Sequence, residues 1–163
     1  MSLPTEAKMA FAFAVRLHFT RVQNIPDMPS GAGRGAVYVD SGTIEGPMLN
    51  GRVVPNSGGD YALFRPDDVL TTDARYMLEA DDGTLILLHN RGYLWGRTPD
   101  VMPRIRDWIF NGGPEVPHSE YYLRSSPTFE VSSGKYDWLM RYIFLGIGER
   151  MQDGNIIRYF ALL

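Results

Sequence analysis

The sequence contains no cysteine, which excludes disulfide bonds, thiolate catalysis and cysteine-ligated zinc. It has no apolar run of about 20 residues, so no transmembrane helix is expected. The apolar run at residues 9–15 is short, ends at Arg16 and lacks the small-residue cleavage site of a secretory signal. These absences make the cytoplasm the expected location and give no reason to expect a membrane partner.

Lysine is also scarce, because Lys8 and Lys135 are the only two and the remaining cationic side chains are arginines. The formal net charge is −3 and no basic cluster occurs, which argues against a nucleic-acid partner. Arginine suits bidentate contacts with carboxylates and phosphates. Genome composition alone can produce the same bias, and that is the simpler explanation.

Several catalytic signatures are missing. No Gly-x-Ser-x-Gly nucleophile elbow occurs, and no two of the three histidines have the spacing of a metal-binding pair. The glycine-rich run at residues 31–35 lacks the Lys-Ser/Thr of a phosphate-binding loop, so it is interpreted as a flexible loop. No metal and no cofactor are therefore expected.

The residues that are present alternate in the manner of short β-strands. From Phe11 to Phe19, large apolar side chains occupy every second position, which is the period of a strand. Glycine, proline, asparagine and aspartate punctuate the rest of the chain at short intervals, and Asp81-Asp-Gly83 is a strong hairpin signal. The predicted strands are Phe11–Val22, Ala36–Ser41, Glu45–Val54, Tyr61–Phe64, Val69–Ala80, Thr84–Arg91, Glu120–Ser125, Thr128–Ser132, Asp137–Gly148 and Ile156–Leu163.

One helix is predicted over Arg97–Asn111. Thr98 can cap it, Pro99 suits a first turn, and Gly112-Gly-Pro114 ends it. Strands at this spacing indicate a sandwich or a closed barrel, and a barrel removes exposed edges. The prediction for these 163 residues is one all-β domain, an antiparallel β-barrel with its helix packed outside or across a mouth. Residues 1–9 are expected to be disordered or a cloning remnant.

Separated motifs of this chain, in order, resemble an uncharacterised bacterial family known as a domain of unknown function. The motifs are Gly42-Thr-Ile-Glu-Gly-Pro-Met-Leu-Asn-Gly-Arg-Val-Val-Pro55, Gly58-Gly-Asp60, Asp73-Ala-Arg-Tyr76, Asp81-Asp-Gly83, Tyr121-Tyr-Leu-Arg124, Pro127-Thr-Phe-Glu130 and Tyr136-Asp-Trp-Leu139. The resemblance implies a small antiparallel barrel, similar in architecture to allene oxide cyclase and dirigent-type barrels, and no general activity. The chain departs from the family pattern at Tyr61 and Met140, where the family tends to carry Trp and Asn.

Two arginines are candidate ligand-binding residues. Arg75 shares a strand face with charged residues, and this face is either solvated or directed into a polar lumen, where Arg75 could bind a carboxylate or enolate oxygen. Arg124 shares a face with Tyr122, and it could clamp an anionic ligand or form a structural ion pair. Trp138 is interpreted as core, or alternatively as a lumen wall that stacks against a ring.

Asp60 and Glu45 are the candidate catalytic residues. Asp60 follows two glycines, where an aspartate most often caps a turn, but it could also act as a general base at the barrel rim. If Asp60 and Glu45 both faced an apolar lumen, one of them would have a raised pKa and could transfer protons at neutral pH.

The leading hypothesis is a pocket for a small, partly apolar, anionic organic molecule. A cofactor-free isomerase, cyclase or lyase would need only this pocket, one base and a partner for an oxyanion. A non-catalytic carrier or sensor, and an assembly protein with a filled barrel, are the alternatives. Apolar residues on both faces of Phe11–Phe19 also suggest a homodimer or higher homo-oligomer.

Overall fold

The structure is a computed structural model that describes residues 3–163. Within these residues the chain forms nine strands, one α-helix and two short 3-10 helices. In chain order they are β1 (Met9–Ile25), β2 (Gly33–Glu45), β3 (Gly51–Val53), β4 (Gly59–Phe64), β5 (Leu70–Ala80), β6 (Leu85–Gly96), α1 (Val101–Asn111), η1 (His118–Glu120), β7 (Tyr121–Val131), η2 (Asp137–Met140), β8 (Phe144–Met151) and β9 (Gly154–Leu162).

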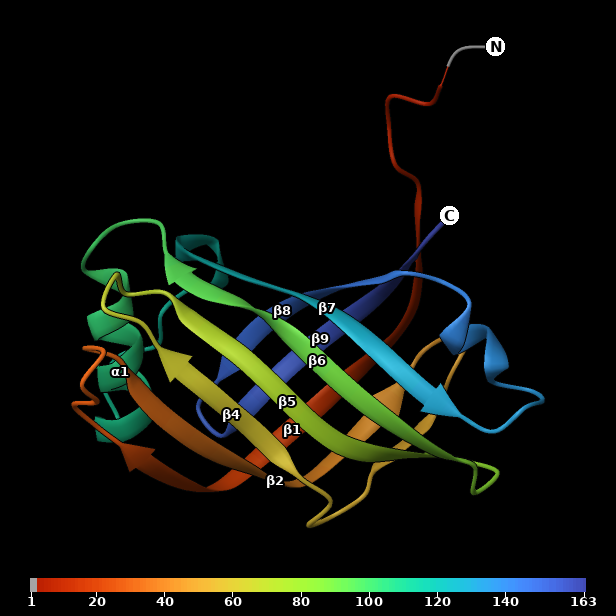
Figure 1. Ribbon diagram of the computed structural model, residues 1–163, viewed down its shortest axis with the longest axis horizontal. Helices are drawn as coiled ribbons and strands as arrows, with labels where there is room; N and C mark the ends of the chain where they lie inside the picture. Colours follow the sequence, from red (N-terminus) through yellow and green to blue (C-terminus); the bar gives the residue numbers. More distant parts are fainter. Residues whose placement is uncertain (1–2) are drawn as a thin grey trace.

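The strands form a closed antiparallel barrel (Figure 1). β1 pairs with β9 on one side and with β2 on the other, which closes the ring. β3 and β4 both lie between β2 and β5, so the nine strands occupy eight positions around the barrel. Closure removes the sheet edges on which further strands could pair. The predicted single antiparallel barrel with one helix is confirmed.

α1 lies across one mouth of the barrel, at the left end of Figure 1. It begins at Val101 rather than at the predicted Arg97, because the Thr98 hydroxyl donates to the Asp100 carboxylate (2.7 Å) instead of capping a helix. Gly112 ends the helix in the left-handed conformation (φ 71°), as glycine after a helix commonly does. Its buried residues Met102 and Ile105 pack into a cluster with Leu94, Tyr121 and Leu123 at this mouth.

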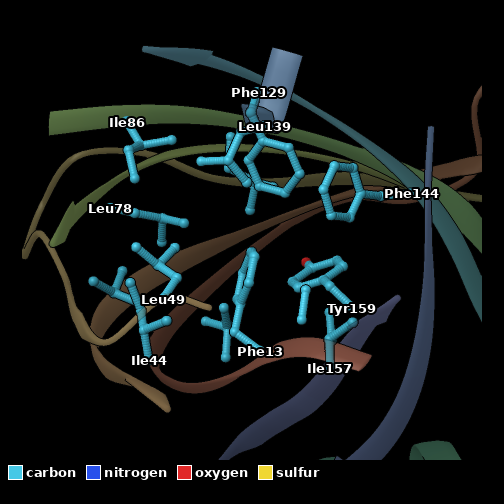
Figure 2. Close-up of a cluster of buried hydrophobic side chains, with 14 of the residues drawn as sticks. Phe13, Ile44, Leu49, Leu78, Ile86, Phe129, Leu139, Phe144, Ile157 and Tyr159 are labelled. Atoms are coloured by element: carbon cyan, nitrogen blue, oxygen red, sulfur yellow. The ribbon is translucent and has the colours of Figure 1, made fainter. Parts of the chain in front are cut away.

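The opposite half of the barrel is filled with side chains (Figure 2). The ring of Phe129 contacts those of Phe13, Phe144 and Tyr159, and Phe13 also contacts Tyr159, with ring centres 5.2–6.1 Å apart in tilted and edge-to-face arrangements. Leu139 of η2 is buried in the same cluster and closes this end. The interior therefore has a filled half beneath η2 and a less filled half beneath α1.

The predicted strands differ from the structure at three places. The predicted strand Asp137–Gly148 is wrong in its first part, which is η2 followed by a turn. In the predicted strand Glu45–Val54, Glu45 ends β2 and only Gly51–Val53 forms a further strand, β3. Asn50 exchanges side-chain hydrogen bonds with the backbone of Gly46 and folds the part between them into a turn. The predicted break in β7 before Thr128 is absent. β7 pairs with β8 only at Arg124 and Ser125, so one edge of the strand beyond them tolerates proline.

None of the helices within residues 3–163 has both the length and the apolar character that crossing a membrane requires.

Candidate functional site

Two adjoining cavities lie in the barrel on the side of α1. The upper cavity, directly beneath α1, has a volume of about 80 Å³, and the lower cavity, deeper in the barrel, has a volume of about 30 Å³. Both are lined mainly by apolar side chains. Five residues line both cavities and thus mark where they meet: Phe19, Asp60, Thr72, Leu123 and Asn155.

Asp60 lies at this junction because of a local opening in the sheet. β4 and β5 pair at Asp60–Ala74 and again at Leu63–Thr71, but not between these positions. In the gap, the backbone N–H of Asp73 donates to Asp60 Oδ1 (2.7 Å) instead of to a carbonyl of β4. The carboxylate thus replaces a missing sheet hydrogen bond, which fixes its orientation at the cavity wall.

The two glycines before Asp60 let β4 approach its neighbours closely. A Cβ on Gly58 would lie 1.9 Å from the carbonyl oxygen of Arg75 on β5, and a Cβ on Gly59 would lie 2.5 Å from the carbonyl oxygen of Val37 on β2. Neither oxygen can move away without breaking the sheet. The Gly-Gly-Asp motif therefore fits β4 between β2 and β5 directly before the carboxylate.

Burial raises the pKa of Asp60 to about 6, because an ionised carboxylate loses hydration among apolar side chains. The hydrogen bond from Asp73 N–H and the positive charge of Arg150 lower the pKa, but together they do not offset the effect of burial. A carboxyl group with such a pKa can accept a proton and return it at neutral pH.

Arg150 of β8 lines the upper cavity together with Asp60. Its Nη1 donates to Asn155 Oδ1 (2.8 Å), its guanidinium lies 5.8 Å from the ring centre of Phe19, and its buried Nε has no hydrogen-bond partner among the described residues. Burial lowers the pKa of Arg150 to about 10, so the group remains a cation at neutral pH. It is the positive charge that can stabilise an oxyanion formed beside Asp60.

Tyrosine and asparagine side chains form a polar group in the floor of the lower cavity. Tyr76 and Asn90 line it, and Asn90 Nδ2 donates to the Tyr159 hydroxyl (3.0 Å). Within residues 3–163, the Tyr76 hydroxyl and Asn90 Oδ1 are buried without hydrogen-bond partners. Burial raises the pKa of Tyr76 well above its usual value, so Tyr76 remains a hydroxyl that can donate a hydrogen bond.

Of the two candidate catalytic residues predicted from the sequence, Asp60 lines the cavities and Glu45 does not. Glu45 is exposed at the end of β2. Val37, the partner of Asp60 on β2, precedes Glu45 by eight residues, about 26 Å of extended strand. The two carboxylates therefore do not meet, and of the predicted pair only Asp60 lines the cavities.

Arg75 and Arg124 lie on the outer face of the barrel. Arg75 is exposed, while its neighbours Ala74 and Tyr76 face the interior. Arg124 Nη1 donates to the carbonyl of Leu123 (2.9 Å), and its guanidinium lies 5.2 Å from the ring centre of Tyr122. The structure thus brings Arg124 and Tyr122 together, but on the outer surface, since Leu123 between them faces the cavities.

The aromatic candidates also lie away from the cavities. Tyr122 stacks on Trp95 on the outer face (ring centres 5.2 Å apart). Trp138 belongs to η2 and packs near Phe144 in the filled half, with ring centres 5.8 Å apart. Neither residue lines the upper or the lower cavity. Trp138 therefore packs against the hydrophobic core, as in the first of its two interpretations, and does not form part of a cavity wall.

The sequence analysis missed Arg150, Asn155, Tyr76 and Asn90 as site residues. A signal for Arg150 was available, because Phe144, Gly146, Gly148 and Arg150 share the buried face of β8 by simple alternation. For Tyr76 and Asn90 the alternation was clear, but no feature of the neighbouring sequence shows that their strand face points into the lumen. Among residues 3–163 no group of three or more His, Asp or Glu side chains could hold a metal ion.

The fold and the site define a class of protein, a helix-capped antiparallel β-barrel with an acid, an arginine and tyrosine hydroxyls in a mostly apolar interior. The chain belongs to the family described as Protein of unknown function (DUF3237), whose model matches residues 7–162. The family resemblance inferred from the separated motifs is thereby confirmed.

Known relatives agree with this assignment. A UPF0311 protein of Clostridium acetobutylicum is 33% identical over 130 residues, which are 79% of this chain and 77% of that protein. The crystal structure of a conserved protein of unknown function from Rhodopseudomonas palustris matches with a TM-score of 0.86 at 25% identity, over 99% of this chain and 100% of that one. The crystal structure of an enzyme from Penicillium herquei matches with a TM-score of 0.70 at 21% identity, over 100% of this chain and 99% of that one. At this identity the match shows a shared fold alone.

Proposed function

We propose that the cavity binds the uncharged, polar head of a small, partly apolar organic molecule, and that Asp60 transfers a proton on that head. The supporting observation is a carboxyl group with a pKa of about 6 at the wall of a mostly apolar cavity that also contains the cation of Arg150. Perturbed carboxyl groups of this kind are typical of general acid–base sites.

The proposed reaction is proton transfer next to a carbonyl group. Ionised Asp60 removes a proton from the carbon beside the carbonyl, and the electrons of the broken C–H bond form a C=C bond as the carbonyl oxygen becomes an enolate. Arg150 or the Tyr76 hydroxyl stabilises that oxygen by donating a hydrogen bond. Protonated Asp60 then returns the proton to the same or a conjugated carbon, which restores the carbonyl and regenerates the carboxylate.

The charges in the cavity favour an uncharged head. Of the three charged residues that line the upper cavity, Asp60 and Arg150 balance each other at neutral pH, and Arg106 is exposed to solvent. A carboxylate brought beside Asp60 would therefore be repelled by it in surroundings that screen charges poorly. A carbonyl or hydroxyl group avoids this repulsion and can still accept a hydrogen bond from Arg150. An isomerase, or a cyclase that starts from an enolate, is the class of activity that this arrangement supports best.

Deuterium exchange tests the proposal without knowledge of the natural substrate. The protein is incubated with cyclohexanone and cyclohexenone in deuterium oxide, and loss of the protons beside the carbonyl is followed by NMR. We expect catalysed exchange whose kcat/KM rises about tenfold per pH unit below pH 6 and levels off above it, because the ionised form of Asp60 is the base.

Asp60→Asn should reduce this exchange by roughly 10²-fold or more, while Asp40→Asn, which removes an exposed carboxylate from β2, should leave it unchanged. Asparagine keeps an oxygen that can accept from Asp73 N–H, so the fold is expected to survive. Exchange that persists in Asp60→Asn contradicts the assignment of Asp60 as the base. Ketone binding that shifts the Asp60 carboxyl resonance without any exchange in the wild-type protein identifies a carrier instead.

A further inference from the structure

An open groove lies beside the capped mouth. Its volume is about 370 Å³, and it is bounded by the connection between β1 and β2, the end of β4 and the second half of α1. Three residues line both this groove and the upper cavity, namely Phe64, Arg106 and Phe110. Phe110 is 51% exposed and thus forms part of an accessible wall rather than of the core. The cavity and the groove therefore adjoin at one side of the cap.

The size of the cavity makes this connection important. At about 80 Å³ the upper cavity accepts a group of a few non-hydrogen atoms, whereas sites for whole ligands commonly measure about 300–1,000 Å³. A molecule larger than the head group must extend out of the cavity. Phe64, Arg106 and Phe110 lie where the cavity adjoins the groove, and the groove has the volume that the rest of such a molecule needs.

The groove has apolar walls and cationic groups. Ile25, Pro26, Phe64 and Phe110 provide apolar surface. The charged residues that line the groove are Arg34, Arg65, Arg106 and Asp27.

The three arginines differ in how fully they are paired. Arg65 forms an ion pair with Asp67, and Arg106 Nη1 lies 3.7 Å from Asp68, beyond hydrogen-bond length. Arg34 Nη1 donates to the backbone carbonyl of Tyr61 (2.9 Å) and has no carboxylate within ion-pair distance among residues 3–163. Arg34 and Arg106 therefore keep donors available for an anion.

We propose that this groove is the second half of the ligand site and that it binds an apolar chain ending in a carboxylate. The uncharged head of the same molecule occupies the cavity at Asp60, so this inference rests on the proposed function for the position of the head. The substrate is then an elongated keto acid, with its carbonyl and its carboxylate at opposite ends. Arg106 and Arg34 select the carboxylate, and Phe64 and Phe110 contact the chain between the two ends.

A series of straight-chain keto acids tests this inference, each with a methyl ketone at one end and a carboxylate at the other. The methyl esters of the same acids serve as neutral counterparts. Affinity is measured by isothermal titration calorimetry at low ionic strength, and occupation of the cavity is followed through the carboxyl carbon resonance of Asp60. For the chain length that spans both sites, we expect the acid to bind about tenfold more tightly than its ester, and both to shift the Asp60 resonance.

Arg106→Gln and Arg34→Gln should each remove most of the preference for the acid over its ester. Arg91→Gln, which removes an exposed arginine from the outer face of β6, is the control for net charge and should keep the preference. Thermal unfolding of each variant confirms that the fold is retained.

The two proposals fail in different ways. Equal affinities for acid and ester in the wild-type protein, or a preference that survives in both Arg106→Gln and Arg34→Gln, would overturn the groove as the carboxylate site. If the acid is preferred but neither compound shifts the Asp60 resonance or exchanges deuterium, the groove binds anions and the proposed function of the cavity is wrong.

Discussion

A single carboxylate illustrates how a residue acquires an unusual role from its surroundings. Asp60 faces the interior because β4 alternates, and it accepts from Asp73 N–H because β4 and β5 do not pair at that point. On the outer face, Asp73 accepts a hydrogen bond from His89 (2.7 Å), so its side chain is held away from the cavity. At the gap in the sheet, the backbone of Asp73 therefore holds the interior carboxylate of Asp60, while the Asp73 carboxylate itself lies on the exterior.

The raised pKa of Asp60 predicts a cost in stability that depends on pH. A carboxyl group whose folded-state pKa lies above its unfolded value binds protons more tightly when folded, so its ionisation destabilises the fold as the pH rises from 3.8 to about 6. This shift corresponds to about 3 kcal/mol above pH 6. Asp60→Asn should therefore raise the free energy of unfolding by up to about 3 kcal/mol at pH 8, and by little at pH 4.

Urea unfolding of both proteins at pH 8, 6 and 4 measures this difference directly, because other titrating groups are common to both. An Asp60→Asn variant that is more stable yet inactive shows that the acid is retained for function at a cost in stability. A difference that does not change with pH means that Asp60 titrates as an ordinary, solvated carboxyl group.

At the scale of elements, α1 covers one mouth of the barrel and thereby encloses the upper cavity. Met102 and Ile105 are 4% exposed and form part of the upper cavity wall as well as of the cluster at the mouth. The sequence predicted the helix, but left open whether it packs outside the barrel or across a mouth. Helix position is decided by the apolar surface that the barrel leaves uncovered.

Ile105→Ala should lower the free energy of unfolding by about 2–5 kcal/mol, because it removes a buried side chain beside space that cannot fully collapse. The variant should also accept keto compounds with bulkier heads, since the upper cavity gains volume. Urea unfolding and the deuterium exchange assay measure the two effects. Ile109→Ala, at a half-buried position on the same helix, is the matched comparison and should cost less.

A cost for Ile105→Ala no larger than that for Ile109→Ala would show that α1 rests loosely on the barrel. The cavity would then be open to solvent rather than roofed, and the cause given for the raised pKa of Asp60 would be wrong as well.

At the scale of the whole molecule, the two halves of the barrel have different packing. The half around Phe13, Phe129 and Tyr159 is filled with interlocking rings, while the half beneath α1 contains both cavities. The alternative of a filled barrel, considered from the sequence, therefore describes one half only. A homo-oligomer stays a prediction.

Hydrogen exchange should report this difference in packing. Amides of β1, β5 and β6 in the filled half should open only with global unfolding, whereas amides of α1 should exchange by local opening at a lower free energy. Such opening would admit a ligand beneath the cap. Native-state exchange followed by NMR over a range of low urea concentrations separates the two classes. Equal protection of α1 and the filled half would contradict the inference that the cap opens alone.

Much of this fold follows from local features of the sequence. Period-two alternation, hairpin turns such as Asp81-Asp-Gly83 and the glycine stop after α1 each depend on a few neighbouring residues. The same local rules placed Asp60 among the candidates, because an acid directly after two glycines either caps a turn or stands at the rim of the barrel. They could not distinguish lumen from exterior, so Arg75 and Arg124 remained candidates although both lie outside.

The sequence by itself determined an antiparallel, cysteine-free barrel with one helix, since alternation and turn chemistry act over short distances along the chain. Only the tertiary structure decided which strand faces line the lumen, and that decision depends on how the ring closes between β1 and β2. Closure also brings Arg150 of β8 to the cavity of Asp60 on β4, two residues that are far apart in the chain. The burial that raises the pKa of Asp60 and the nearby charge of Arg150 that partly opposes the rise are both properties of the closed barrel, because burial and charge act through space.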